Sequence, residues 1–155
     1  LPEGGDENQD DSNDSAAGLY VIFSQNWLGV PKQLKYVWST TVPEGTIGRR
    51  NMIARPWFFV LESGERNLGR WVFEQVDLEA HHELKLGGKV SDRTIGLGLL
   101  TDANSTHTRA EADYADLRVW TRAALRDGQI TDYCDCRNQA PGATGGGAPS
   151  QEVSR

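Results

Sequence analysis

The side chains best suited to chemistry lie in one polar stretch, residues 99–120, which reads LLTDANSTHTRAEADYADLRVW. An apolar run ends before Thr101, a polar loop follows, and from residue 111 apolar and polar residues alternate as in a strand. Oxygen-bearing side chains recur along the stretch: Asp102, Asn104, Glu111, Asp113 and Asp116. Such groups hold calcium, bind sugar hydroxyls, transfer protons, or solvate the edge of a sheet.

Calcium binding requires about six to eight oxygen ligands from carboxylates, amides, backbone carbonyls and water. Asp102, Asn104 and Asp116 would supply several of them if the loop folds back beside the last predicted strand. The spacing is not that of an EF-hand loop, and Asp113 and Asp116 point to opposite faces of a strand. We therefore favour the alternative in which Asp102 and Asn104 bond to their own backbone in a turn.

Catalysis by carboxylates is a second alternative for the loop. A glycosidase needs two carboxyl groups that flank the scissile bond, but a chain with 22 Asp and Glu residues contains such pairs by chance. No Walker loop, HExxH motif, serine elbow or CxxC pair is present. The adjacent pair His81 and His82 could form a transition-metal patch, yet neighbouring helical residues project about 100° apart, so a solvated helix face is favoured.

Aromatic residues indicate a further chemistry, because their faces stack on sugar rings. Five Trp are many for a chain of 155 residues. Trp38 and Trp71 lie within predicted strands and are assigned to the core, since Trp is highly buried on average. Trp27, in the loop SQNWLGVP, and Trp57 are the candidates for a surface position at which a sugar ring could stack. Arg55 favours an acidic glycan or solubilises a sheet edge, so we predict ligand contacts at Trp27, Trp57 and Arg55.

The scaffold for these residues is predicted to be β-rich. Segments with a period of two, rich in β-branched and aromatic residues, are separated by turn signals and cover residues 18–23, 33–40, 51–62, 70–78, 94–101 and 111–121. Residues 77–86 instead predict a helix, with Asp77 as N-cap and Gly87 as stop. A weaker helix is predicted near Arg122. The pattern indicates an all-β, antiparallel β-sandwich of jelly-roll type with one short helix, and six strands leave such a sandwich incomplete.

Composition limits the partners and divides the chain. A net charge of −6 argues against binding to nucleic acid or to an anionic membrane surface, and no apolar run reaches the length of a membrane span. Residues 1–18 carry six carboxylates and no Lys or Arg, and residues 138–155 are rich in Gly, Ala, Pro and Ser, so both are predicted to be disordered tails. Between them lie a β-sandwich domain at 19–121 and a weak helix with a tail at 122–137, where Cys134 and Cys136 are interpreted as free or loosely oxidised thiols.

The order of motifs resembles DUF3047, a family of bacterial proteins of unknown function. The resemblance rests on blocks of sequence in the same order, namely LYVIF at 19–23, LKYVWSTTVPEGT at 34–46, VLESGERNLGRWVFEQVDL at 60–78, IGLGLLTDANST at 95–106 and AEADYADLRV at 110–119. Two positions depart from the family pattern, with Gly18 in place of an Arg and Asn104 in place of a carboxylate. Family members also carry further strands at their N-terminus, so the resemblance implies a truncated or diverged member with a β-sandwich of the sugar-binding-module type.

The function expected from these observations is a non-catalytic binding module for cell-envelope or other polysaccharide, and the resemblance suggests the periplasm or cell envelope as its location. One alternative is a carbohydrate-active hydrolase or lyase that uses the loop carboxylates. Another is a structural envelope protein that oligomerises through an open sheet edge. Calcium is the one cofactor that the residues suggest, at Asp102, Asn104 and Asp116.

Overall fold

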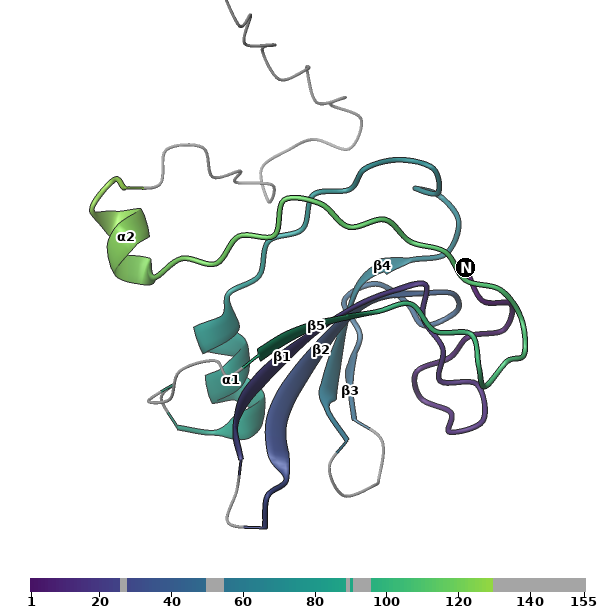
Figure 1. Ribbon diagram of the computed structural model, residues 1–155, viewed down its shortest axis with the longest axis horizontal. Coiled ribbons are helices and arrows are strands. Elements are labelled where there is room, and N and C mark those ends of the chain that lie inside the picture. Colours follow the sequence, from purple (N-terminus) through teal and green to yellow (C-terminus); the bar gives the residue numbers. More distant parts are fainter. Residues whose placement is uncertain (26–27, 50–54, 89, 91–95, 130–155) are drawn as a thin grey trace, which may run out of the picture. The chain divides into compact units, whose positions relative to one another are not determined.

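The computed structural model describes residues 1–25, 28–49, 55–88, 90 and 96–129. Within them, five strands form one mixed sheet in the order β3-β4-β2-β1-β5 (Figure 1). The strands are β1 (Ala17–Gln25), β2 (Pro31–Ser39), β3 (Ile47–Gly48), β4 (Trp57–Ser63) and β5 (Gly96–Leu100). The chain divides into two units, of which Leu1–Val72 with Val76–Val119 holds the sheet and the helix α1 (Leu78–Leu86). The other, Phe73–Gln75 with Trp120–Arg155, holds α2 (Arg122–Arg126).

Strand direction differs from the antiparallel pattern that the sequence predicts. β1 pairs antiparallel with both β2 and β5, whereas β2 and β4 are parallel, with Leu34 opposite Trp57. The two-residue β3 lies between β2 and β4 in the chain and pairs antiparallel with β4. Alternation of polar and apolar residues identifies a strand but is blind to its direction, so this parallel pair could not be predicted.

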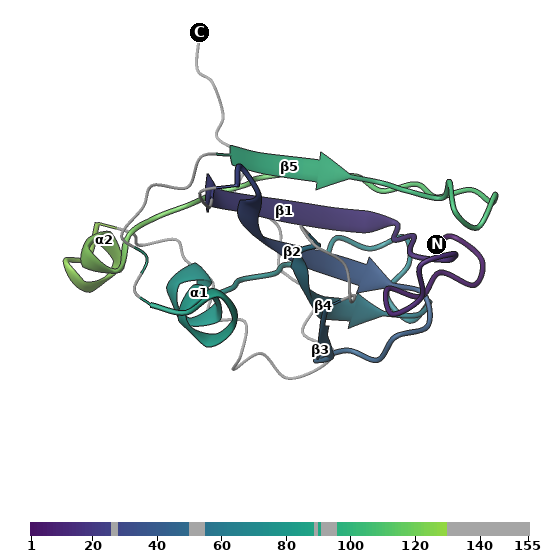
Figure 2. The same ribbon diagram turned by 90° about the horizontal axis from the view of Figure 1, so that it is seen from below.

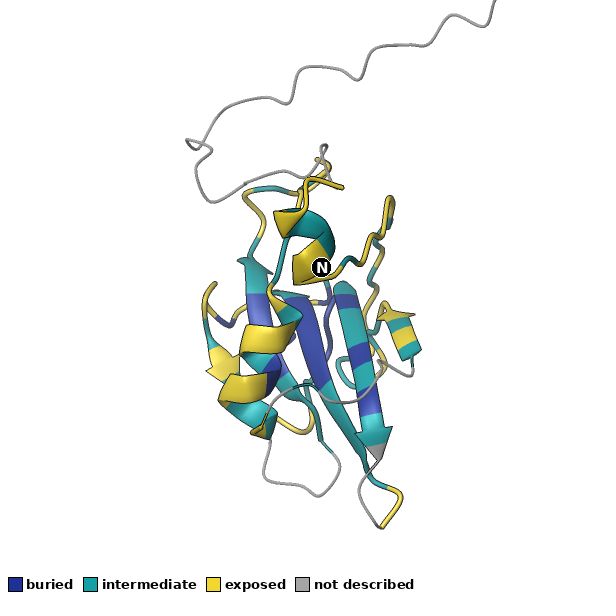
Figure 3. Cartoon of the chain, turned by 90° about the vertical axis from the view of Figure 1, so that its left-hand side faces the viewer, coloured by how far each residue is buried: buried dark blue, intermediate teal, exposed yellow. Residues whose placement is uncertain are grey.

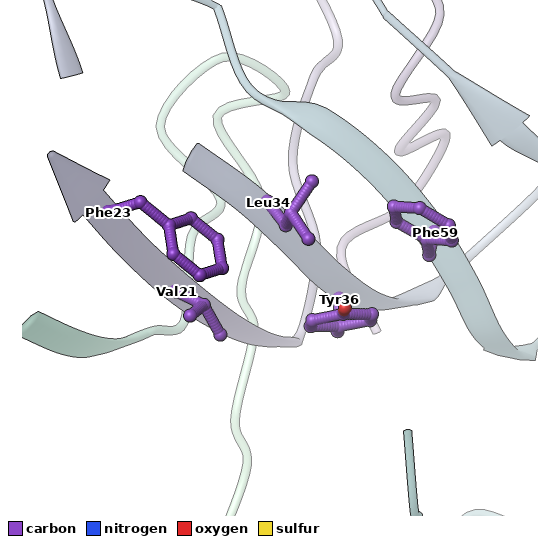
Figure 4. Packing of buried hydrophobic residues seen from close by; sticks show 5 residues of the cluster. All are labelled: Val21, Phe23, Leu34, Tyr36 and Phe59. Atoms are coloured by element: carbon purple, nitrogen blue, oxygen red, sulfur yellow. The ribbon is translucent and has the colours of Figure 1, made fainter. Parts of the chain in front are cut away.

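A smaller buried cluster consists of Val37, Val42, Phe58 and Val60. The larger hydrophobic cluster lies on the other face of the sheet (Figure 4). Alternate residues of the three central strands build it: Val21, Phe23, Leu34, Tyr36 and Phe59. Helix α1 lies against this face and contributes Leu78 and Leu86 (Figure 2). Each such buried side chain contributes about 1.5–3 kcal/mol, and buried residues are concentrated in the central strands (Figure 3).

Helix α1 confirms the prediction of a helix at residues 77–86. The carboxylate of Asp77 accepts a bond of 3.0 Å from the backbone N–H of Ala80, which satisfies one donor of the first turn. The helix ends at Gly87, whose φ of 76° is accessible to glycine and strained for other residues. The weaker helix near Arg122 is also confirmed, as α2. None of the helices in the described part of the chain has the length and apolarity that a membrane crossing requires.

A second sheet is not present in the described residues, so the predicted sandwich is not shown. Residues 70–77 and 111–121, predicted to be strands, pair with no other strand in the described residues. Trp71, predicted to lie in the core, is 72% exposed. A period of two shows that a segment can pair, but pairing also needs a neighbouring strand of matching register. β5 is an edge strand, and oligomerisation through such an edge stays a prediction.

The N-terminal segment, residues 1–16, is packed against the sheet rather than disordered as its composition predicts. Pro2, Glu7 and Asp14 are buried, and the hydroxyls of Thr40 and Thr41 donate to backbone carbonyls of the segment. Hydrogen bonds to the end of β2, rather than apolar burial, hold the segment in place. The predicted tail at 138–155, with Cys134 and Cys136, lies outside the described residues.

Candidate functional site

A small cavity opens on the face of the sheet opposite α1. It has a volume of ≈ 50 Å³ and is lined by Asn13, Tyr20, Lys35, Arg55, Pro56 and Phe58. Tyr20 lies opposite Lys35 in the β1–β2 register, and Lys35 lies opposite Phe58 in the β2–β4 register. Residues opposite one another in a sheet project from the same face, so these three side chains form one row across the central strands.

Lys35 places a cation in the middle of this row. Its side chain is 3% exposed, and its ammonium lies 5.6 Å from the centroid of the Tyr20 ring, a cation–π geometry. The Lys35 stem passes close to Gly18, where a Cβ would lie 3.6 Å from its Cε, an ordinary contact, and a tighter 3.2 Å from the carbonyl oxygen of Leu100. Arg55 and Pro56, just before β4, and Asn13 complete the rim.

Glu7 is a buried carboxyl group whose charge interacts with Lys35. Its Oε2 accepts a hydrogen bond from the hydroxyl of Ser39, and its Oε1 has no hydrogen-bond partner within the described residues. Burial raises the pKa of Glu7 above its ordinary value, against weaker opposing effects from the Ser39 bond and the Lys35 charge. Glu7 therefore holds its proton more tightly than an exposed glutamate does.

Asp14, which the sequence did not single out, is bound by the polar loop at residues 101–106. Its two carboxylate oxygens accept backbone N–H bonds from Ser105 (3.3 Å) and Thr106 (2.6 Å), and the N–H of Asp102 donates to the carbonyl of Ser15 at 3.0 Å. Burial opposes ionisation, but the bonds from Thr106 and Ser105 outweigh it and lower the pKa of Asp14. The loop lies in one of the motif blocks that carry the family resemblance, but Asp14 precedes the first of these blocks.

The loop residues predicted to bind calcium form local contacts instead. The carboxylate of Asp102 accepts from the N–H of Asn104 at 3.2 Å, which is the turn interpretation favoured from the sequence. Both oxygens of Asp116 accept from the guanidinium of Arg118, at 3.1 and 2.8 Å. A guanidinium on both oxygens does not fit a cation ligand, and no cluster of three or more His, Cys, Asp and Glu side chains suited to a metal occurs in the described residues.

The predicted sugar-binding residues are not brought together. Trp57 packs beside the core on the α1 face, with the Lys85 ammonium 4.6 Å and the Arg49 guanidinium carbon 5.8 Å from its ring centroid. Arg55 lines the cavity on the opposite face. Trp27 lies outside the described residues. Of the predicted set, Arg55 alone is placed in the cavity, and Tyr20 and Lys35 were missed because nothing in a single strand marks them as neighbours of Arg55.

The two adjacent histidines contact the sheet rather than forming the predicted solvated helix face. The ring of His81 stacks on Phe59 with centroids 4.2 Å apart and bonds through Nδ1 to the Tyr36 hydroxyl at 3.0 Å. His82 is 5% exposed and meets Phe23 edge-on. Burial lowers the pKa of His81 against an opposing attraction from Asp77. Both rings belong to the packing of α1 on the core.

Comparison with known proteins agrees with the resemblance noted in the sequence. The model of a family described as "Protein of unknown function (DUF3047)" matches residues 1–118. The matched region includes the N-terminal segment, all five strands and the loop that binds Asp14. No curated protein and no solved structure matches the chain significantly.

Proposed function

The chain belongs to the DUF3047 family of proteins of unknown function, and we propose that it is a non-catalytic binding module for saccharides of the cell envelope or of another polysaccharide. The cavity on the sheet face opposite α1 carries this proposal. Its lining combines the aromatic residues Tyr20 and Phe58 with the polar residues Asn13 and Arg55. Apolar and aromatic walls with a few placed polar groups are typical of small-molecule sites.

The size of the cavity limits what can enter it. At ≈ 50 Å³ it is far below the roughly 300–1,000 Å³ of sites that enclose a whole small molecule. One substituent of a sugar would enter, while the ring rests at the rim. Binding to a chain of such sugars, one substituent at a time, suits a module that attaches to a surface polymer rather than one that encloses a substrate.

A hydrolase or lyase that uses the loop carboxylates has less support. Asp14 is held by backbone N–H groups, Asp102 closes a turn, and Asp116 pairs with Arg118. Each of these carboxylates has a local structural partner. The periplasm or cell envelope as location, and a jelly-roll-like sandwich, remain parts of this proposal.

A glycan array probed with the full 155-residue chain tests the binding function. We expect binding to a subset of glycans that Tyr20→Leu weakens, because this change removes an aromatic wall of the cavity. Trp71→Leu is the matched control, since Trp71 is 72% exposed and is not among the lining residues. A folded chain that binds no glycan would overturn the proposal, and loss in Trp71→Leu alone would move the site away from the cavity.

A further inference from the structure

Two cationic side chains meet at one cavity in a chain whose net charge is −6. Lys35 approaches from the middle of the sheet and Arg55 from the segment before β4. The rest of the lining is uncharged: Asn13, Tyr20, Pro56 and Phe58. The charged residues of the lining are therefore opposite in sign to the net charge of the molecule, which favours an anionic group at this place over a cation.

The surroundings of Lys35 strengthen its attraction for an anion. Only 3% of the side chain is exposed, and a charge in such a low-dielectric setting acts more strongly than one in water. Arg55 adds a planar guanidinium, which matches a carboxylate with two parallel hydrogen bonds.

We propose that the cavity binds the carboxylate of an acidic sugar, a uronic acid unit within a polysaccharide, between Lys35 and Arg55. This inference rests on the proposed saccharide-binding function and names its ligand class. A carboxylate is small enough for a cavity of ≈ 50 Å³, and the uronic acid ring then lies at the rim beside Tyr20 and Phe58. Neutral sugars offer only hydroxyls to the two cations and bind more weakly.

The test compares oligogalacturonate with its methyl ester of the same length, by calorimetry on the full chain in about 0.15 M salt, where long-range attraction is screened. The two probes share their rings and linkages and differ in the charged carboxylate. We expect the acid to bind about tenfold more tightly than the ester, the scale of a hydrogen bond to a charged group. Equal affinities would overturn the carboxylate assignment and leave the binding function standing, whereas binding of neither probe would count against both.

Arg55→Gln removes one cation without disturbing the buried Lys35. We expect this variant to bind the acid about tenfold more weakly and the ester unchanged. Arg66→Gln is the matched control, because Arg66 is exposed and lies 3.6 Å from Glu44 rather than in the cavity. An equal loss in Arg66→Gln would mean general charge attraction and overturn the assignment, as would displacement of the acid by inorganic phosphate at lower concentration than by acetate.

Discussion

Two carboxyl groups of the N-terminal segment are buried in opposite electrostatic settings. Asp14 accepts two backbone N–H bonds, which favour its charged form, whereas Glu7 shares one hydroxyl donor and is dominated by burial. The pKa of Asp14 is therefore lowered and that of Glu7 is raised. At the scale of single residues, hydrogen bonds to a buried carboxylate oppose the effect of burial, and their sum outweighs it at Asp14 but not at Glu7.

Glu7→Gln tests the effect of the buried proton on stability. Because the pKa of Glu7 is raised in the folded state, the folded chain binds the proton more tightly than the unfolded chain. The corresponding stability is present below the unfolded pKa and is lost as the pH rises through the folded pKa. We expect the variant to be more stable than the wild type at pH 8 and to lack this decline with pH.

Urea denaturation of both chains at pH 5 and pH 8 measures this difference. Glu65→Gln is the control, because Glu65 is exposed and its replacement removes the same charge. A variant that is less stable than the wild type at pH 8 would show that the charged carboxylate of Glu7 stabilises the fold.

At the scale of elements, local signals predicted the helices well and the sheet in part. Asp77 and Gly87 mark the ends of α1 because capping is a contact between neighbours in sequence. The strands expected at 18–23, 33–40 and 94–101 are present as β1, β2 and β5. Pairing depends on distant segments, so neither the parallel β2–β4 pair nor the unpaired segment at 111–121 could be predicted.

The contact between α1 and the sheet is expected to weaken in acid. Burial lowers the pKa of His81, so the unfolded chain binds this proton more readily than the folded one. The stability is complete above the unfolded pKa near 6.5 and falls as the pH drops below it. The charged group facing His81 is Asp77, which moderates the effect. We expect the fall in thermal midpoint between pH 7.5 and pH 5 to be smaller in His81→Phe than in the wild type.

Tyr36→Phe separates the effect of His81 protonation on stability from the effect of losing the hydrogen bond between Tyr36 and His81. This variant removes the hydroxyl that bonds to His81 at 3.0 Å and keeps the titratable ring. We expect it to be less stable at every pH and to retain the acid-dependent fall. Identical pH profiles for wild type and His81→Phe would mean that His81 does not couple to folding.

At the scale of the whole molecule, hydrogen bonds attach a segment that has too few apolar residues to be held by hydrophobic burial. The N-terminal segment has few apolar residues, and composition therefore predicts disorder. It is nevertheless tied to Ser39, Thr40 and Thr41 after β2 and to the loop at 101–106. Composition measures what a segment can bury and not whether its donors and acceptors find partners. The cavity has the same origin, since it joins residues from the segment, three strands and the approach to β4.

Deletion of residues 1–16 tests whether this segment is part of the fold. The deletion leaves the hydroxyls of Ser39, Thr40 and Thr41 without their partners and opens the loop that binds Asp14. Several buried or partly buried hydrogen bonds are lost together, so we expect the thermal midpoint, followed by circular dichroism, to fall by about 10 °C. Asp14→Asn, which removes only the charge in the loop, should cause a smaller fall. A deletion variant with an unchanged midpoint would mean that residues 1–16 are a dispensable tail, as their composition alone predicts.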